Sequence, residues 1–115
     1  MRPGQITPTE FEMAILERLA SEHGVPALAQ EKLHVLSRKF TGAGSFTKFY
    51  PREALPGLSS GNISLEAIIS VPGVPTGLDA LLFVDSGYPT CLEITTFGED
   101  LWDGTSVGFN ISSAK

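Results

Sequence analysis

The chain has 115 residues and a net charge of −5, with 42% hydrophobic and 18% charged residues. This length suits one domain spanning residues 1–115, and the composition is that of a globular protein and excludes a disordered one. No apolar run approaches the roughly 20 residues of a membrane span, and the N-terminal segment lacks the apolar stretch of a secretory signal. Cys91 is the only cysteine, which excludes an internal disulfide framework. These features predict a cytoplasmic, bacterial type of protein without membrane contact.

Charge is divided unevenly along the chain. Residues 1–52 carry seven Lys or Arg and five Asp or Glu, whereas residues 53–114 carry eight Asp or Glu and no Lys or Arg. The acidic stretch repels polyanions, so nucleic acid is not expected as a partner. Either the two halves complement each other within one fold, or an acidic face binds a basic protein partner. A further alternative is a homodimer, in which the cationic segment of one chain meets the acidic half of another.

The N-terminal part of the chain predicts one or two helices. The stretch TPTE, residues 7–10, has the form of a capping box, in which a threonine hydroxyl caps the free amides and the glutamate reaches back. Apolar residues then recur at helical spacing, at Phe11, Ile15 and Leu19. A second, short helix is predicted to start at Pro26.

The rest of the chain predicts strands. The stretch LHVLSRKF, residues 33–40, fits both helical spacing and alternation, and a strand is chosen because FTKFY alternates after two glycines. Further strands are predicted over NISLEAIIS, LDALLFVD and CLEITTF, with a last, frayed strand over TSVGFNIS. The expected fold class is α+β, with the helices packed on an antiparallel sheet of about five or six strands. The glycine and proline content of the connections would let this sheet curl toward a barrel.

The glycines in Gly42-Ala43-Gly44 have three interpretations. A phosphate loop needs further glycines or a lysine at set spacing and a helix after it, and the sequence has neither. Cations and aromatics interleave over residues 38–52, as in a stacking platform for single strands, but the acidic chain argues against nucleic acid. Glycines that accept positive φ at the tip of a hairpin explain the segment.

Two motifs in the central and later chain carry a resemblance to a known group of proteins. The chain resembles small bacterial proteins with an S-R-x-F/Y-T-G-x-G-x-F-T-x-F hairpin and a closing G-Y-x-x-x-L-E strand. The similar positions are Ser37, Arg38, Phe40, Thr41, Gly42, Gly44, Phe46, Thr47, Phe49, Gly87, Tyr88, Leu92 and Glu93. The resemblance supports the predicted strand topology. It does not point to an activity, because no activity is established for that group.

Polar residues at strand positions predict a candidate site. Arg38 alternates with apolar residues on one strand, and Glu66 and Glu93 lie on two others. Because a buried charge needs a partner, Arg38 is expected to pair with Glu93. One alternative is that the three residues are exposed and unrelated. The other is a site for a small molecule, or a minor enzyme, centred on Arg38, Glu66 and Glu93, with Tyr50 at the end of the hairpin as a further ligand-binding residue.

Catalytic and metal chemistry have weaker support. Two carboxylates divide acid and base roles only at a defined separation, which a sequence does not supply. A dyad of Cys91 with His34 or His23 is conceivable, but a thiol within an apolar strand is usually inert. One cysteine and two histidines at this spacing form no recognisable ligand set, so neither a metal nor a cofactor is predicted.

The segment GEDLWDG, residues 98–104, is a candidate partner-binding site. It places Glu99, Asp100 and Asp103 around Trp102 without the ligand pattern of a calcium loop. Either Trp102 anchors a solvated loop, or it is exposed among the acids as a hot spot for a basic protein. The expected function is a non-enzymatic binding module, in its most concrete form an immunity-type inhibitor of a basic partner.

Overall fold

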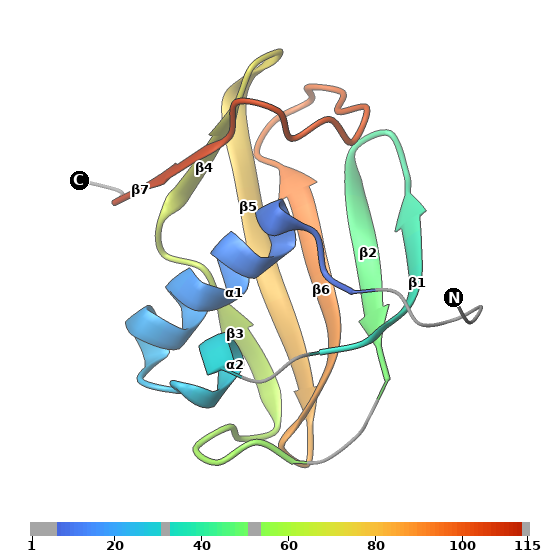
Figure 1. The fold of residues 1–115 in the computed structure, drawn as a ribbon. Coiled ribbons are helices and arrows are strands. Elements are labelled where there is room, and N and C mark those ends of the chain that lie inside the picture. The colour runs from blue at the N-terminus through green and yellow to red at the C-terminus, as the bar shows by residue number, and fades with distance from the viewer. Residues whose placement is uncertain (1–6, 31–32, 51–53, 114–115) are drawn as a thin grey trace.

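The structure, a computed structural model, describes residues 7–30, 33–50 and 54–113. These residues form two layers, with two helices on one face of a seven-stranded antiparallel sheet (Figure 1). The elements are α1 (Glu10–His23), α2 (Ala27–Gln30), β1 (Val35–Phe40), β2 (Gly44–Phe49), β3 (Gly61–Ser64), β4 (Ile68–Val71), β5 (Val74–Asp85), β6 (Tyr88–Thr96) and β7 (Asn110–Ser112). The predicted α+β class is confirmed.

The sheet has the order β1-β2-β6-β5-β4-β7, and β3 also pairs with β5. It is open, because among the described strands β1 pairs only with β2 and β7 only with β4. The predicted curl toward a barrel therefore does not occur. Helix α1 packs on the apolar face of the sheet (Figure 1), so that burying this face does not require the sheet to close.

The segment predicted as one strand, residues 62–70, forms the two strands β3 and β4. They pair with different halves of β5, which has twelve residues. Helix α1 holds the break between them, because the carboxylate of Glu22 accepts hydrogen bonds from the backbone N–H groups of Glu66 (2.8 Å) and Ala67 (2.9 Å). This break explains why the sheet has seven strands and not the five or six predicted.

Residues 35–49 form the predicted hairpin. β1 and β2 pair antiparallel, with a bulge between Val35 and Ser37. Gly42 lies in the turn with φ +88°, a conformation that glycine adopts without steric cost. The choice of a strand over a helix for residues 33–40 is therefore right. The predicted role of the glycines is right for Gly42 and wrong for Gly44, which has no positive φ and is the first residue of β2.

The N-cap of helix α1 lies two residues later than the N-cap of the predicted capping box. The N-cap is Thr9, whose hydroxyl accepts from the backbone N–H of Glu12 (3.1 Å), while the N–H of Thr9 donates to Glu12 Oε1 (2.8 Å). The box is therefore Thr9 with Glu12 and not Thr7 with Glu10. In this register the Glu12 side chain points into the protein, where it meets charged and polar partners on the sheet.

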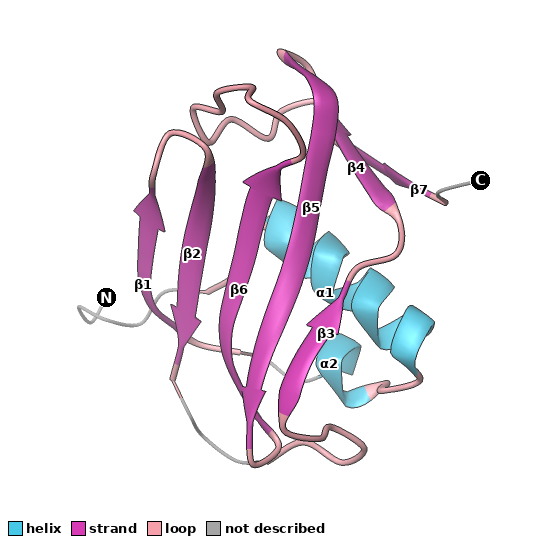
Figure 2. Ribbon diagram, turned by 180° about the vertical axis from the view of Figure 1, so that it is seen from behind, coloured by secondary structure: helices cyan, strands magenta, loops and turns pink. Residues whose placement is uncertain are grey.

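The core lies between α1 and the sheet, and it follows the expected periodicities. Figure 2 shows the sheet in front of both helices, so its second face carries neither of them. Side chains alternate between the two faces along each strand. The buried positions that face the helices include Leu78, Ala80 and Leu82 on β5 and Leu92 and Ile94 on β6, opposite Phe11, Ile15 and Leu19 of α1.

Candidate functional site

A polar cluster joins the start of α1 to the hairpin. Arg38 on β1 donates from Nε to Oε2 of Glu12 at 2.8 Å and from Nη2 to Oε1 at 2.6 Å, which makes a bidentate pair. Thr47 on β2 donates from its hydroxyl to Oε2 of Glu12 at 2.7 Å. Arg38 and Thr47 are direct partners in the β1–β2 register, so both side chains lie on the helix-covered face.

Four donors saturate the Glu12 carboxylate. Oε1 accepts from Thr9 and Arg38, and Oε2 accepts from Arg38 and Thr47. Burial raises the pKa of Glu12, but the hydrogen bonds from Arg38, Thr47 and Thr9 outweigh burial and hold this pKa below its usual value. A carboxylate offers about four lone-pair sites, so none is left to take a proton from a substrate. The cluster therefore connects the helix to the sheet, and Glu12 does not act as a general base.

The expected pair between Arg38 and Glu93 does not form. Glu93 is the register partner of Phe46, which lies between the inward-facing Ser45 and Thr47 on β2. Glu93 and Phe46 therefore share the sheet face opposite to the helices, while Arg38 lies on the helix side. The prediction that Arg38 needs a carboxylate partner is right, and the choice of Glu93 as that partner is wrong.

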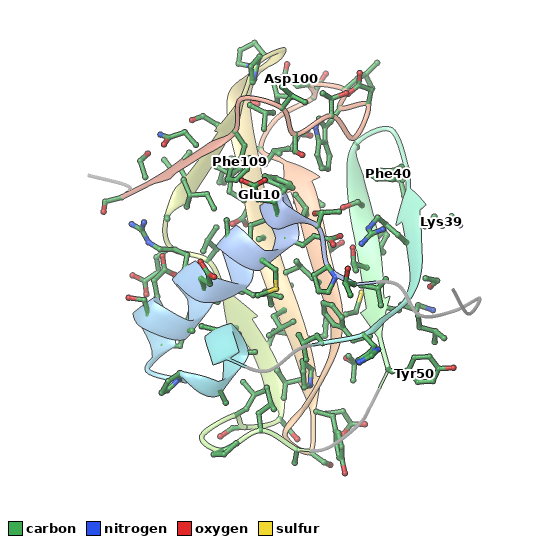
Figure 3. All side chains as sticks on the ribbon, in the orientation of Figure 1. Glu10, Lys39, Phe40, Tyr50, Asp100 and Phe109 are labelled. Carbon is green, nitrogen blue, oxygen red and sulfur yellow. The ribbon has the colours of Figure 1, made fainter. Side chains whose placement is uncertain are left out.

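The other predicted ligand-binding residues also lie outside the cluster around Arg38. Glu66 is exposed in the link between β3 and β4, and Tyr50 is exposed just after β2. Figure 3 shows the Tyr50 ring directed away from the sheet, and its backbone N–H donates to the carbonyl of His34 at 2.9 Å. The structure does not assemble a site from Arg38, Glu66, Glu93 and Tyr50.

Glu12 is the member of the cluster that the sequence analysis missed. A signal for it was present, because Glu12 stands at helical spacing before Ile15, Leu16 and Leu19, which are all buried. A carboxylate on the apolar stripe of a helix is almost never buried without a cationic partner. Arg38, a strand residue also predicted to be buried, is the cation that such a carboxylate requires.

A small hollow opens beside the cluster. Its volume is about 60 Å³, and Arg38, Phe40 and Trp102 are among the residues that line it. This volume is enough for a few water molecules and is far below the roughly 300 Å³ at which small-molecule sites begin. The hollow has room for water and not for an organic substrate.

A wider hollow of about 370 Å³ lies between α1 and β7 and is open to solvent. Its one cation, Arg18, donates to the hydroxyl of Ser113 at 3.1 Å and lies 3.6 Å from the carboxylate of Glu22. The carboxylate of Glu22 beside Arg18 and the exposed Glu17 in the lining make this groove a poor site for an anionic ligand.

The segment 97–109, which we call the acidic loop, crosses one end of the sheet between β6 and β7 (Figure 1). Asp100 accepts from the backbone N–H (3.1 Å) and the hydroxyl (2.6 Å) of Thr76 at the start of β5. The backbone N–H of Trp102 donates to the carbonyl of Gly42 at 2.8 Å, so the loop also contacts the tip of the β1–β2 hairpin. These contacts attach the acidic loop to β5 through Thr76 and to the β1–β2 hairpin through Gly42.

Trp102 anchors the acidic loop. The side chain is only 4% exposed, and its ring centroid lies 6.1 Å from that of Phe11 and 6.3 Å from that of Phe40. Its indole Nε1 donates to the carbonyl of Thr105 at 2.9 Å, which satisfies the buried N–H. The interpretation of Trp102 as an anchor is right, and its candidacy as an exposed hot spot is wrong.

Other side chains of the acidic loop face the solvent. Leu101 is 79% and Val107 is 80% exposed, and Phe97 is 53% exposed. Of the predicted acids, Glu99 and Asp103 are exposed, whereas Asp100 is partly buried against Thr76. The sequence analysis named these acids and missed the exposed apolar residues. From sequence alone, an apolar side chain in a loop is as consistent with burial in the core as with exposure to solvent.

Within residues 7–30, 33–50 and 54–113, no group of three His, Cys, Asp or Glu side chains is placed to hold a metal ion. Neither described helix is long and apolar enough to cross a membrane. Comparisons of the chain with models of protein families, with curated proteins and with solved structures found no match.

Proposed function

We propose that this protein is a non-enzymatic binding module that recognises a basic protein through its acidic loop, as an immunity-type inhibitor does. The observation that carries the proposal is the exposure of Leu101 and Val107, about four-fifths of each residue, in the same loop as the exposed Glu99 and Asp103. Apolar groups surrounded by charge are the composition of an interface, in which a partner removes the apolar part from water and pairs the rim.

The charge of the chain supports a basic partner. Residues 53–114 contain no Lys or Arg, so no cation from this stretch neutralises the loop. Hydrogen bonds from Thr76 lower the pKa of Asp100, and hydrogen bonds from Thr105 lower the pKa of Asp103. An aspartate is ionised at neutral pH, and these hydrogen bonds favour the charged form further. A negative loop of this kind attracts a positive surface before contact and raises the association rate.

The fixed position of the loop lowers the entropic cost of binding. Its path is set by the Asp100–Thr76 hydrogen bonds, by the bond between Trp102 and Gly42, and by the burial of the indole. A loop that is already ordered loses less conformational entropy when it binds than a free loop does. Leu101 and Val107 are thereby presented outward while their neighbour Trp102 holds the backbone.

The test is capture of a partner with matched baits, followed by measurement of the isolated pair. The baits are the wild type, Leu101→Ala/Val107→Ala, Glu99→Gln/Asp103→Gln, and the control Leu36→Ala/Glu17→Gln, which changes one apolar and one acidic exposed residue outside the loop. We expect a basic protein whose Kd rises about tenfold or more with each loop variant. Its association rate should also fall between about 50 mM and about 500 mM salt.

Two results would contradict the proposal. The first is a captured protein that binds the loop variants and the control equally well, which would place the contact elsewhere. The second is an association rate that does not change with salt, which would remove the role of the acidic residues. Unchanged unfolding curves of the loop variants would show that any loss of binding is not a loss of folding.

A further inference from the structure

The face of the sheet opposite to the helices is a second candidate surface, and it is independent of the acidic loop. Among the described residues no helix lies on it (Figure 2). The strand registers arrange its side chains in rows across β1, β2, β6 and β5. One row is Lys39, Phe46, Glu93 and Leu81, and the next contains Lys48, Cys91 and Phe83.

The centre of this open face is apolar. Phe46, Leu81, Phe83 and Cys91 lie on three adjacent strands, and each of them keeps part of its surface in contact with solvent. In a two-layer protein, the face of an antiparallel sheet that is turned to solvent commonly carries polar residues. Here large apolar side chains occupy the middle of the face, which is the arrangement of a surface that packs against another.

Charges on the open face are balanced and separated, unlike those of the whole chain. Lys39 and Lys48 lie on β1 and β2, while Glu93 and Asp79 lie on β6 and β5. The patch thus holds two cations on one side and two anions on the other, in a chain whose net charge is −5. Asp85 lies further along β5, at the turn to β6, outside the patch. A surface with this pattern is complementary to itself when one copy is turned over.

We infer that the open face binds a second copy of this chain. A two-fold axis parallel to the strands, between β2 and β6, sets β2 of each copy over β6 of the other and β1 over β5. Lys48 then lies over Cys91 of the second copy, next to its Glu93. Lys39 lies over Leu81 of the second copy, with its Asp79 two residues further along β5.

The size of the open face suits a contact at the weak end of the range seen for protein interfaces. The four strands β1, β2, β6 and β5 at about 4.8 Å spacing and the nine residues of β6 at about 3.3 Å each span a face of roughly 570 Å² at most. A standard interface buries about 800 Å² of each partner. The acidic loop lies at the end of the sheet and stays outside this contact, so the dimer presents two such loops.

The first test is sedimentation over a range of protein concentrations. Two variants lower the net charge equally: Lys39→Gln/Lys48→Gln on the open face, and Ser21→Glu/Ser59→Glu at exposed positions elsewhere. We expect the wild type and the second variant to dimerise and the first variant to dissociate at concentrations at least tenfold higher. A wild type that stays monomeric throughout, or a dimer that both variants weaken equally, overturns the inference.

The second test uses the single cysteine. In the inferred dimer the two Cys91 side chains lie across packed sheets, within reach of a bis-maleimide of about 10 Å. We expect the wild type to be linked into a covalent dimer and Cys91→Ser/Glu17→Cys, with its thiol on the exposed side of α1, to remain unlinked. A wild type that sediments as a dimer and is not linked would assign the dimer to another surface.

Discussion

Glu12 and Arg38, 26 residues apart in the chain, are joined by two hydrogen bonds of 2.8 and 2.6 Å. Glu12 belongs to the capping box of α1 and Arg38 to the end strand of the sheet, so the pair links the two layers of the fold. Thr47 adds a third contact from the neighbouring strand. One carboxylate therefore fixes the start of the helix, β1 and β2 relative to one another.

The first prediction is that Glu12→Gln destabilises the protein by about 2–4 kcal/mol. The amide places an NH₂ group where the carboxylate accepted a hydrogen bond from Arg38, so that two donors face each other, and the guanidinium loses its counter-charge. The measurement is urea unfolding followed by the fluorescence of Trp102, the only tryptophan. Glu10→Gln is the control, because Glu10 is exposed on the same turn and should change stability by less than about 0.5 kcal/mol. Equal midpoints for the two variants would show that the pair contributes nothing.

The second prediction concerns acid. Because the pKa of Glu12 is lower in the folded protein than in the unfolded chain, the stability it contributes is present above the unfolded pKa of about 4.3 and is lost as pH falls through the folded value. The difference in urea midpoint between the wild type and Glu12→Gln should therefore be constant from about pH 7 to about pH 5 and shrink below about pH 4.

The same comparison separates Glu12 from the other acids. The pKa values of Asp100 and Asp103 are also lowered, but both residues are present in both proteins, so their effect cancels in the difference. A midpoint difference that persists unchanged to about pH 3 would mean that Glu12 has the same pKa in the folded and unfolded states.

The sequence predicts the layers of this fold better than its polar contacts. Alternation and helical spacing are local, so they place Ile15 and Leu82 in the core and the hairpin at residues 35–49 without knowledge of the topology. The break between β3 and β4 is not local, because it depends on Glu22 reaching the backbone from α1. A distant side chain therefore decides where the predicted strand is interrupted.

The candidate site shows the same limit. Arg38 is identifiable because a cation among apolar strand residues must have a partner, but the partner depends on which face of the sheet Arg38 occupies. A bulge between Val35 and Ser37 and the register with β2 set that face, and neither is visible in the local pattern. Glu12 was not considered as the partner, because the capping box was placed on Thr7 and Glu10 and not on Thr9 and Glu12. The exposure of Leu101 and Val107 depends on the path of the acidic loop. Burial of Trp102 sets that path, and this burial is also a tertiary contact.

The third prediction separates the two glycines of the hairpin tip. A Cβ at Gly44 would fall on the backbone carbonyl oxygen of Ile94, because Gly44 pairs with Thr95 where β2 and β6 approach closely. Neither backbone can move without breaking the ladder, so Gly44→Ala should cost about 3 kcal/mol, or about 12 °C in Tm. At Gly42 a Cβ meets no atom within 4 Å, and only the positive φ of +88° is unfavourable. Gly42→Ala should therefore cost about 1 kcal/mol, or about 4 °C.

Thermal unfolding followed by circular dichroism measures both variants under the same conditions. The order of the two effects is the result that matters, because both substitutions add one methyl group to the same turn region. If Gly42→Ala lowers Tm as much as Gly44→Ala does, the hairpin glycines serve the turn alone and the close approach of β2 to β6 does not constrain position 44. If Gly44→Ala is the more damaging variant, Gly44 is required by strand packing, and the pairing of β2 with β6 is as tight as its register implies.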